Sequence, residues 1–204
     1  DQFVLSKNKL LSTIAYKIDG KICYALEGSI FIAGAVVQWL RDSINIIDTA
    51  DQVGHLASKA KDQNIYFVPA FTGLGAPYWD PEARGAIFGL LRDTGKEEIA
   101  LAALESIGFQ TRDLLEAMIK DVEGIEKAHI KLRVDGGMTQ SSLTMKILAN
   151  LTGVEINLPN IQESTAKGVA WLAGMRAGLY SQLDVFEREW ALKEKFSPVL
   201  SSGL

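Results

Sequence analysis

The sequence predicts an α/β domain in which helices cover the faces of a mixed sheet. Segments with the two-residue period of strands alternate along the chain with segments of helical period, which is typical of a layered α/β fold. Hydrophobic residues make up 48% of the 204 residues, enough for a sizeable core. Neither a shift in composition nor a repeat divides the chain, so we expect one domain over residues 1–204.

A β-hairpin is expected first, at residues 10–27. Two segments of strand period flank Asp19-Gly20, and a two-residue Asp-Gly loop is typical of a type I′ turn. We expect Ser29 to cap a helix at 30–41, because serine is a preferred N-cap residue. This helix is apolar on nearly all sides, so it is expected to be buried between layers.

Gly34 and Gln38 break the apolar pattern of that helix. They lie four residues apart and therefore share one face. A glycine inside a helix costs about 1 kcal/mol relative to alanine, and a buried glutamine amide needs hydrogen-bond partners. Either Gly34 leaves room for a ligand that Gln38 binds, or it admits a neighbouring element while Gln38 reaches a backbone carbonyl. The helix alone leaves both interpretations open.

Four regular elements are expected in the middle of the chain. The longest is a helix with Glu97 and Glu98 in its first turn, where acidic residues complement the helix dipole, and we expect Asp93-Thr94 to cap it. The four elements are a surface helix at 49–61, strands at 65–68 and 85–91, and the long helix at 96–122.

Segment 70–84 fits neither period, because its glycines and prolines interrupt both. Phe71, Tyr78 and Trp79 give it more apolar surface than a slack linker has. Long ordered loops of this composition usually serve a function. If the loop normally docks on a partner domain, its aromatic side chains are expected to be exposed here and to promote self-association.

Asp135-Gly136-Gly137 follows a strand expected at 128–135. Two glycines permit a sharp turn and let a ligand lie directly against the main chain. We expect Thr139 to cap the next helix, whose unpaired N–H groups suit a phosphate or an adenosine ribose. Taken alone, such a motif more often marks a tight turn without a ligand.

The C-terminal part is expected to contain a strand at 154–158, a helix at 163–174, a short amphipathic helix after Leu183 and an extended tail. In the helix at 163–174, Ala166, Ala170 and Gly174 recur every four residues, a spacing that favours close packing by another helix or a ligand.

Composition argues against several classes of function. A formal charge of -4 gives no electrostatic support for binding nucleic acid or an anionic membrane. The single cysteine, Cys23, can form no internal disulfide, which suits a reducing cytoplasm. His55 and His129 are not spaced as metal ligands, and no apolar run approaches the ~20 residues of a membrane span. The chain opens on Asp1, so we expect a fragment or a processed chain.

Three stretches of the chain form distinctive motifs. They are Tyr24-Ala-Leu-Glu-Gly28, the loop from Phe67 to Pro81 with its Thr-Gly-Leu-Gly-Ala-Pro-Tyr-Trp-Asp-Pro sequence, and Gly85-x-Ile87-x-Gly89-Leu90 followed after seven residues by Glu98-Ile99-x-x-Ala102-Ala103-Leu104-Glu105. Together they resemble the C-terminal domain of the FGGY family of carbohydrate kinases, and within it the glycerol kinases. The resemblance covers nearly the whole chain, from about residue 10 to 198. It implies an actin/hexokinase/Hsp70-like ATPase fold, which is ribonuclease H-like, with residues 1–204 as the nucleotide-side half of the kinase.

The resemblance also implies a nucleotide site. By position, Gly34 and Gln38 would contact ATP and Gly137 would lie against its adenosine portion. The family usually has an asparagine that touches adenine where this chain has Ser141, so a direct contact is left open there and one through water is the alternative. The helix at 163–174 is expected to pack behind the pocket.

The implied activity is transfer of the γ-phosphate of ATP to glycerol, giving sn-glycerol 3-phosphate. The catalytic aspartate, the glycerol-binding residues and most groups that hold Mg²⁺ are expected in a missing N-terminal domain. We therefore expect no catalytic residue or metal ligand here and an inactive fragment, and self-association to a homo-oligomer is left open. One alternative is another FGGY sugar kinase, for a pentulose or hexulose. The other is a non-catalytic interaction domain, which Ser141 favours weakly and the other predicted contacts argue against.

Overall fold

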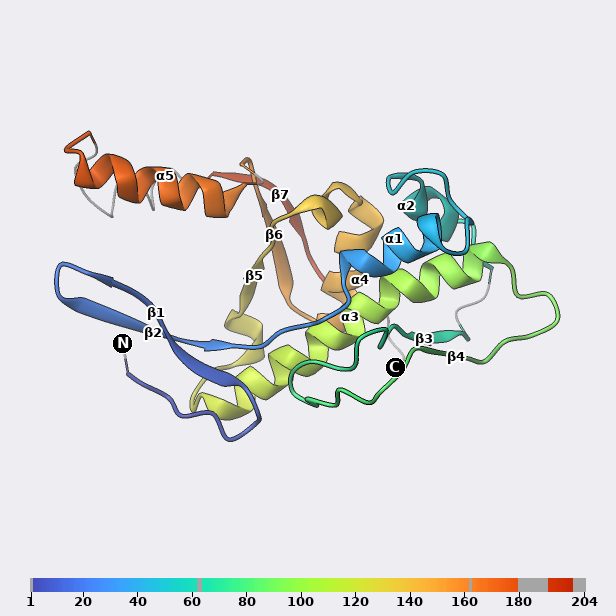
Figure 1. Ribbon diagram of the computed structural model, residues 1–204, viewed down its shortest axis with the longest axis horizontal. Coiled ribbons are helices and arrows are strands. Elements are labelled where there is room, and N and C mark those ends of the chain that lie inside the picture. The colour runs from blue at the N-terminus through green and yellow to red at the C-terminus, as the bar shows by residue number, and fades with distance from the viewer. Residues whose placement is uncertain (1, 62–63, 162, 180–190, 200–204) are drawn as a thin grey trace.

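The computed structural model describes residues 2–61, 64–161, 163–179 and 191–199 (Figure 1). It confirms the expected α/β class. In chain order the elements are β1 (Leu11–Ile18), β2 (Lys21–Glu27), α1 (Gly34–Asp42), α2 (Gln52–Ala57), β3 (Tyr66–Val68), β4 (Ala86–Phe88), α3 (Lys96–Asp121), the 3-10 turn η1 (Lys127–His129), β5 (Lys131–Arg133), the 3-10 turn η2 (Gly137–Gln140), α4 (Ser142–Thr152), β6 (Glu155–Pro159), α5 (Ser164–Arg176) and β7 (Leu192–Phe196).

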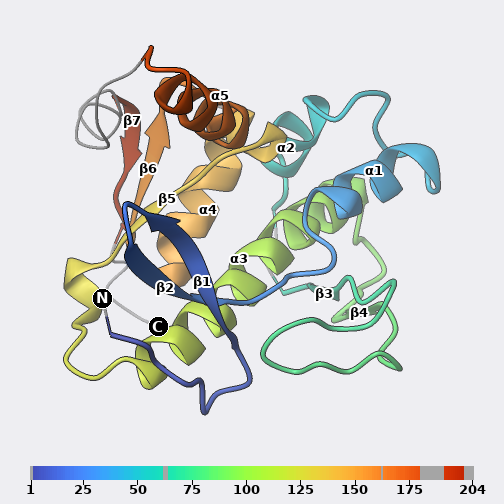
Figure 2. The ribbon, with the colours of Figure 1, turned by 60° about the vertical axis from the view of Figure 1, so that its left-hand side comes forward.

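The strands form small sheets around one long helix. β1 and β2 pair antiparallel, as do β3 and β4, whereas β6 pairs parallel with β5 and antiparallel with β7. In Figure 2 α3 runs through the middle, with β5, β6 and β7 on one side and α1, α2, β3 and β4 on the other. β7 falls in the segment that the sequence predicts only as an extended tail.

The predicted hairpin is confirmed. Asp19 and Gly20 both have positive φ angles, +48° and +80°, as a type I′ turn requires. The hairpin joins the rest of the domain at its base, where Leu10 is buried with Ala76 and Ala117. Its strands leave Leu11, Ile14 and Tyr16 45–57% exposed.

Two larger hydrophobic cores lie along α3. The first joins the N-terminal half of α3 to α1, α2 and β3, with Leu40 and Leu104 fully buried. The second joins Leu115 of α3 to α4 and the sheet of β5, β6 and β7, with Ile156 fully buried. The same helix therefore contributes to both cores.

α1 begins at Gly34, four residues later than expected, and Ser29 does not cap it. The carbonyl of Ser29 accepts a hydrogen bond from Ala76 N at 2.9 Å, which holds the segment before α1 against the long loop. The helix is amphipathic rather than buried on all sides. Its buried face is Val36, Val37 and Leu40, whereas Gln38 is exposed.

The expected caps of α3 and α4 were also wrong. Gly95, not Asp93 or Thr94, precedes α3, and its N–H donates to Glu98 Oε2 at 2.9 Å. Thr139 lies inside η2, where its hydroxyl donates to Gly136 O at 2.7 Å. Ser141 is the N-cap of α4 instead, because a short 3-10 turn separates the glycines from the helix.

α5 does not pack as expected. Ala166 and Ala170 are exposed, although Gly174 is buried. Figure 1 shows α5 extending away from α1 and α2, and none of its residues lines the cavity described below. The helix expected after Leu183 falls outside the described residues.

The loop at 70–84 is ordered, as predicted. The Phe71 ring packs at a tilt against Trp39 with ring centroids 5.2 Å apart, Tyr78 Oη donates to Asp113 at 2.7 Å, and Trp79 Nε1 donates to Lys9 O at 2.6 Å. Tyr78 and Trp79 nevertheless stay 49% and 39% exposed. In the described ranges, no helix is both long and apolar enough to cross a membrane.

Candidate functional site

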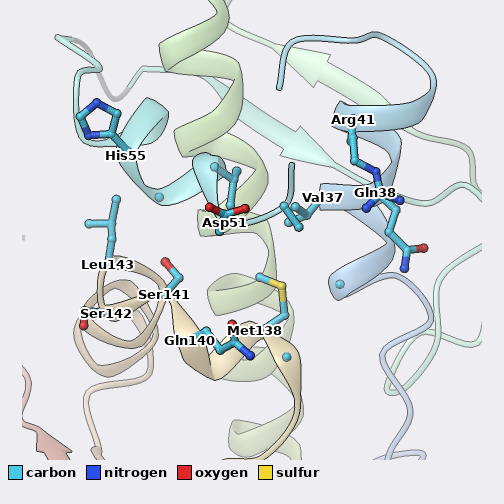
Figure 3. Close-up of a pocket in the computed structure, with 15 residues that line it drawn as sticks. Val37, Gln38, Arg41, Asp51, His55, Met138, Gln140, Ser141, Ser142 and Leu143 are labelled. Carbon is cyan, nitrogen blue, oxygen red and sulfur yellow. The ribbon is translucent and has the colours of Figure 1, made fainter. Parts of the chain in front are cut away.

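A cavity of about 680 Å³ lies between α1, α2, η2 and the N-terminal end of α4 (Figure 3). All four residues that the sequence predicts as ligand contacts, Gly34, Gln38, Gly137 and Ser141, line it. The fold thus brings together two segments that are far apart in the sequence. The remaining lining residues are Val37, Arg41, Ala50, Asp51, Val53, Gly54, His55, Met138, Gln140, Ser142 and Leu143.

The two glycines keep their part of the wall free of side chains. A Cβ on Gly137 would have no neighbour within 4 Å, and one on Gly34 would meet only the side chain of Met138, at 3.6 Å from Cγ. A methyl group at either position would therefore fit without displacing other atoms. Of the two interpretations of Gly34, the structure therefore favours room for a ligand over close approach of another element.

Hydrogen bonds donated to the Asp135 carboxylate fix the turn that carries Gly137. Its carboxylate accepts from Gly136 N at 2.7 Å and from Ser164 N, at the start of α5, at 2.8 Å. The Ser164 N–H is the main cause that holds the pKa of Asp135 below its usual value. Gly136 has a φ of +91°, a conformation that favours glycine. Asp135 therefore shapes the turn and does not line the cavity.

Ser141 stands where η2 passes into α4. Its Oγ accepts from Thr144 N at 3.2 Å, which is the usual N-cap bond. In Figure 3 the Ser141 side chain points from the start of α4 toward α2. The N-terminal end of α4, with Ser142 and Leu143, also borders the cavity, so its positive dipole end faces this space.

Arg41 is a lining residue that the sequence analysis missed. It follows Gly34 by seven residues and Gln38 by three, so all three lie on one face of α1, and that spacing is the signal that points to it. Its guanidinium binds Asp42 through Nε at 2.6 Å and Nη2 at 2.8 Å. This hydrogen-bonded pair raises the pKa of Arg41 and lowers that of Asp42.

Asp51 and His55, both on or beside α2, were missed for a different reason. The sequence indicates α2 only as a surface helix, and nothing local shows that it lies opposite Gly137. Val53, Leu56 and Ala57 bury one side of α2 in the first core, which turns its other side toward the cavity.

The cavity is lined by groups of the kind that bind a ligand. Val37, Met138 and Leu143 supply apolar surface for a flat ring, while amides, hydroxyls and one guanidinium supply hydrogen-bonding groups. In the described part of the chain, no three His, Cys, Asp or Glu side chains come together as a metal site.

Comparisons with known proteins agree on one family. The model of the FGGY family of carbohydrate kinases, C-terminal domain, matches residues 4–177. The chain is 55% identical over 200 residues to glycerol kinase of Allorhizobium ampelinum, covering 98% of this chain and 40% of the relative. It is 53% identical over 205 residues to glycerol kinase of Roseobacter denitrificans, covering 100% of this chain and 41% of the relative.

Solved structures give the same result for the fold. Plasmodium falciparum glycerol kinase with ADP matches with a TM-score of 0.85 at 34% identity, over 97% of this chain and 39% of that one. Gluconate kinase from Lactobacillus acidophilus matches with a TM-score of 0.79 at 26% identity, over 98% of this chain and 40% of that one. The expected actin/hexokinase-like ATPase fold is confirmed, and the chain spans about 40% of the length of its relatives.

Proposed function

This chain belongs to the FGGY family of carbohydrate kinases, and on that premise we propose that it is the nucleotide-binding, C-terminal part of a glycerol kinase. The complete protein would transfer the γ-phosphate of ATP to glycerol, giving sn-glycerol 3-phosphate. One observation carries the proposal. Gly34, Gln38, Gly137 and Ser141, singled out from the sequence, line one cavity in a chain that is 53–55% identical to glycerol kinases.

The cavity suits the nucleoside end of ATP. The faces of Gly34 and Gly137 let the base and ribose lie on the backbone, because neither residue has a Cβ to exclude them. The Gln38 amide offers both a donor and an acceptor, and the Ser141 hydroxyl does the same. The free N–H groups at the start of α4 add positive potential beside the ligand.

The residues that line the cavity do not form a magnesium site by themselves. Asp51 is the one carboxylate among the residues that line the cavity, and Mg²⁺ usually combines one or two carboxylates with phosphate oxygens and water. We therefore assign Mg²⁺ to the phosphates of ATP and to groups outside this chain, and we assign no step to it here.

The contribution of this chain to the reaction is positioning. Phosphoryl transfer depends mainly on alignment and on neutralising charge around the γ-phosphate. Binding energy gained at the nucleoside end holds the phosphates in place for the acceptor. Deprotonation of glycerol is assigned to the rest of the protein. We place the reaction in the cytoplasm, where the unpaired Cys23 suits reducing conditions.

We propose glycerol rather than a sugar as the acceptor of the phosphoryl group. The glycerol kinase structure is 34% identical to this chain, against 25% and 26% for the xylulose and gluconate kinases of Lactobacillus acidophilus. A purely structural role gains no support from the fold, since the cavity is lined by binding groups and reaches the surface at Gln38 and Gly137.

The proposal is tested with a chimera. This chain replaces the matching part of Roseobacter denitrificans glycerol kinase, and ATP-dependent phosphorylation of glycerol is measured. We expect an active chimera in which Gly137→Val raises the KM for ATP and leaves the KM for glycerol unchanged. Gly168→Val is the matched control, because Gly168 lies on α5, does not line the cavity and has nothing within 4 Å of a Cβ built there. A chimera with native-like circular dichroism and glycerol binding but no phosphoryl transfer contradicts the proposal.

A further inference from the structure

Gly54, in the interior of α2, has a steric reason to be glycine that points to Ser141. A Cβ built on Gly54 would lie 2.8 Å from Ser141 Oγ and 3.8 Å from Ser141 Cβ, with no other neighbour inside 4 Å. Its φ is not in the positive region, so the backbone conformation does not require glycine. Glycine lowers helix stability relative to alanine. The close approach of Ser141 is therefore the reason that the structure gives for a glycine at this position.

The contact sets the position of one hydroxyl in the cavity wall. Ser141 Oγ already accepts a hydrogen bond from Thr144 N at 3.2 Å, and α2 lies against it from the other side. Gly54 therefore allows the hydroxyl to keep both its cap bond and its place in the wall of the cavity that both residues line. With the oxygen acting as acceptor for the cap, the O–H hydrogen is left for a ligand.

We propose that Gly54 is a positioning residue that holds the Ser141 hydroxyl toward the nucleoside portion of the bound nucleotide. The inference rests on the proposed function and deepens it, since it assigns α2 a role in recognising the base or ribose. It also accounts for a short serine at this position. With α2 this close, the hydroxyl is placed by packing rather than by the reach of a longer side chain.

A double-mutant cycle tests the inference with the 204-residue chain. Wild type, Gly54→Ala, Ser141→Ala and the double variant are titrated with ATP, adenosine and inorganic tripolyphosphate, and binding is followed by heteronuclear NMR. Gly54→Ala is expected to weaken adenosine and ATP by about fivefold and to leave tripolyphosphate unchanged. In the Ser141→Ala background the same change is expected to have no further effect, because a methyl group at 3.8 Å from Cβ is an ordinary contact.

Gly168→Ala is the matched control, because Gly168 lies on a different helix, α5, and a Cβ there would meet nothing within 4 Å. It is expected to leave the affinity for adenosine unchanged. The inference is overturned if Gly54→Ala binds adenosine like wild type, if it weakens binding equally with and without Ser141, or if tripolyphosphate binding falls in parallel. If wild type binds neither adenosine nor ATP at millimolar concentration, the proposed function fails first and the inference falls with it.

Discussion

At the scale of single residues, we expect a substitution at Gly34 to change ligand affinity without lowering the stability of the fold. The nearest atoms to a Cβ at this position belong to Met138, at 3.6 and 3.8 Å, so alanine fits without displacing anything. We expect Gly34→Ala to leave the melting temperature unchanged or slightly raised, since alanine favours helix. The same methyl group enters the cavity, and we expect ATP affinity to fall by about fivefold, or roughly 1 kcal/mol.

Calorimetric titration with ATP and thermal unfolding of the same samples check this prediction. Val36→Ala serves as the contrast, because Val36 is fully buried in the first core and does not line the cavity. It is expected to lower stability without a specific loss of ATP affinity. Equal loss of stability and affinity in Gly34→Ala would argue that the residue serves packing alone.

Tyr78 gives a prediction about pH. The hydrogen bond that it donates to Asp113 is the main cause that raises the pKa of Tyr78 to about 12. A raised pKa means that the folded state holds the proton more tightly. The stability from this bond is therefore complete below about pH 10, the unfolded value. It is lost as the pH rises through about 12.

Ultraviolet titration of tyrosinate absorbance measures this directly. In Tyr78→Phe the step near pH 12 is expected to disappear, and the stability of the variant relative to wild type is expected to improve between about pH 10 and 12. A wild-type titration curve that shows no step near pH 12 beyond the curve of Tyr78→Phe would be inconsistent with the Tyr78–Asp113 bond.

At the scale of elements, the sequence predicts best where the signal is local. The Asp19-Gly20 turn holds its conformation within two residues, so the hairpin and its ends follow from the sequence. The starts of α1 and α4 depend on distant or intervening structure instead. Ala76 N–H, from the long loop, binds the Ser29 carbonyl that precedes α1, and η2 delays the start of α4 until Ser141. The periodicity of the sequence indicates neither the bond to Ser29 nor the 3-10 turn before α4.

The residues of the cavity also divide into those that a local sequence pattern reveals and those that only tertiary packing places there. Gly34 and Gln38 stand out because they interrupt an apolar helix, although Gln38 proved exposed rather than buried. Gly54 and His55 have no such local contrast within α2. Their place in the wall depends on how α2 packs against α3 and α4, which no pattern within α2 reveals.

The loop at 70–84 depends on Gly75 for its close approach to the segment before α1. A Cβ on Gly75 would lie 2.0 Å from Ser29 O, which is a backbone atom and cannot rotate away. We expect Gly75→Ala to destabilise the protein by about 2–3 kcal/mol, as overpacking of a tight site does. Urea unfolding measures the loss, with Gly168→Ala, where the site is open, as the control. A loss of less than about 0.5 kcal/mol would mean that the loop can shift freely.

At the scale of the whole molecule, α3 contributes to both large cores, and we expect them to unfold as one cooperative unit. Leu40 is fully buried in the first core and Ile156 in the second, and α3 supplies residues to both. We expect Leu40→Ala and Ile156→Ala each to cost about 2–5 kcal/mol, and the two losses to add because the sites share no core cluster.

Unfolding in urea followed by tryptophan fluorescence and by circular dichroism tests this expectation. The two probes are expected to give one coincident transition in wild type and in both single variants. Two separate transitions, each moved by only one of the substitutions, would show that the cores unfold independently.

The exposed aromatic side chains Phe31, Tyr78 and Trp79 also act at this scale. They are 41%, 49% and 39% exposed, and the Phe31 and Trp79 rings lie edge to face with centroids 6.2 Å apart. We expect the isolated chain to self-associate through this surface. Light scattering is expected to show a mass that rises with concentration and rises less in Phe31→Ser. A clean monomer at high concentration would contradict this prediction.

The measurement that tests the central claim most directly is a heteronuclear NMR titration of this chain with ATP. The account predicts that amide shifts cluster at Gly34, Gln38, Gly137 and Ser141 and extend to Arg41 and Gly54, all of which line the cavity. Shifts centred on another part of the surface, or none at millimolar ATP, would contradict the assignment of this cavity as the nucleotide site.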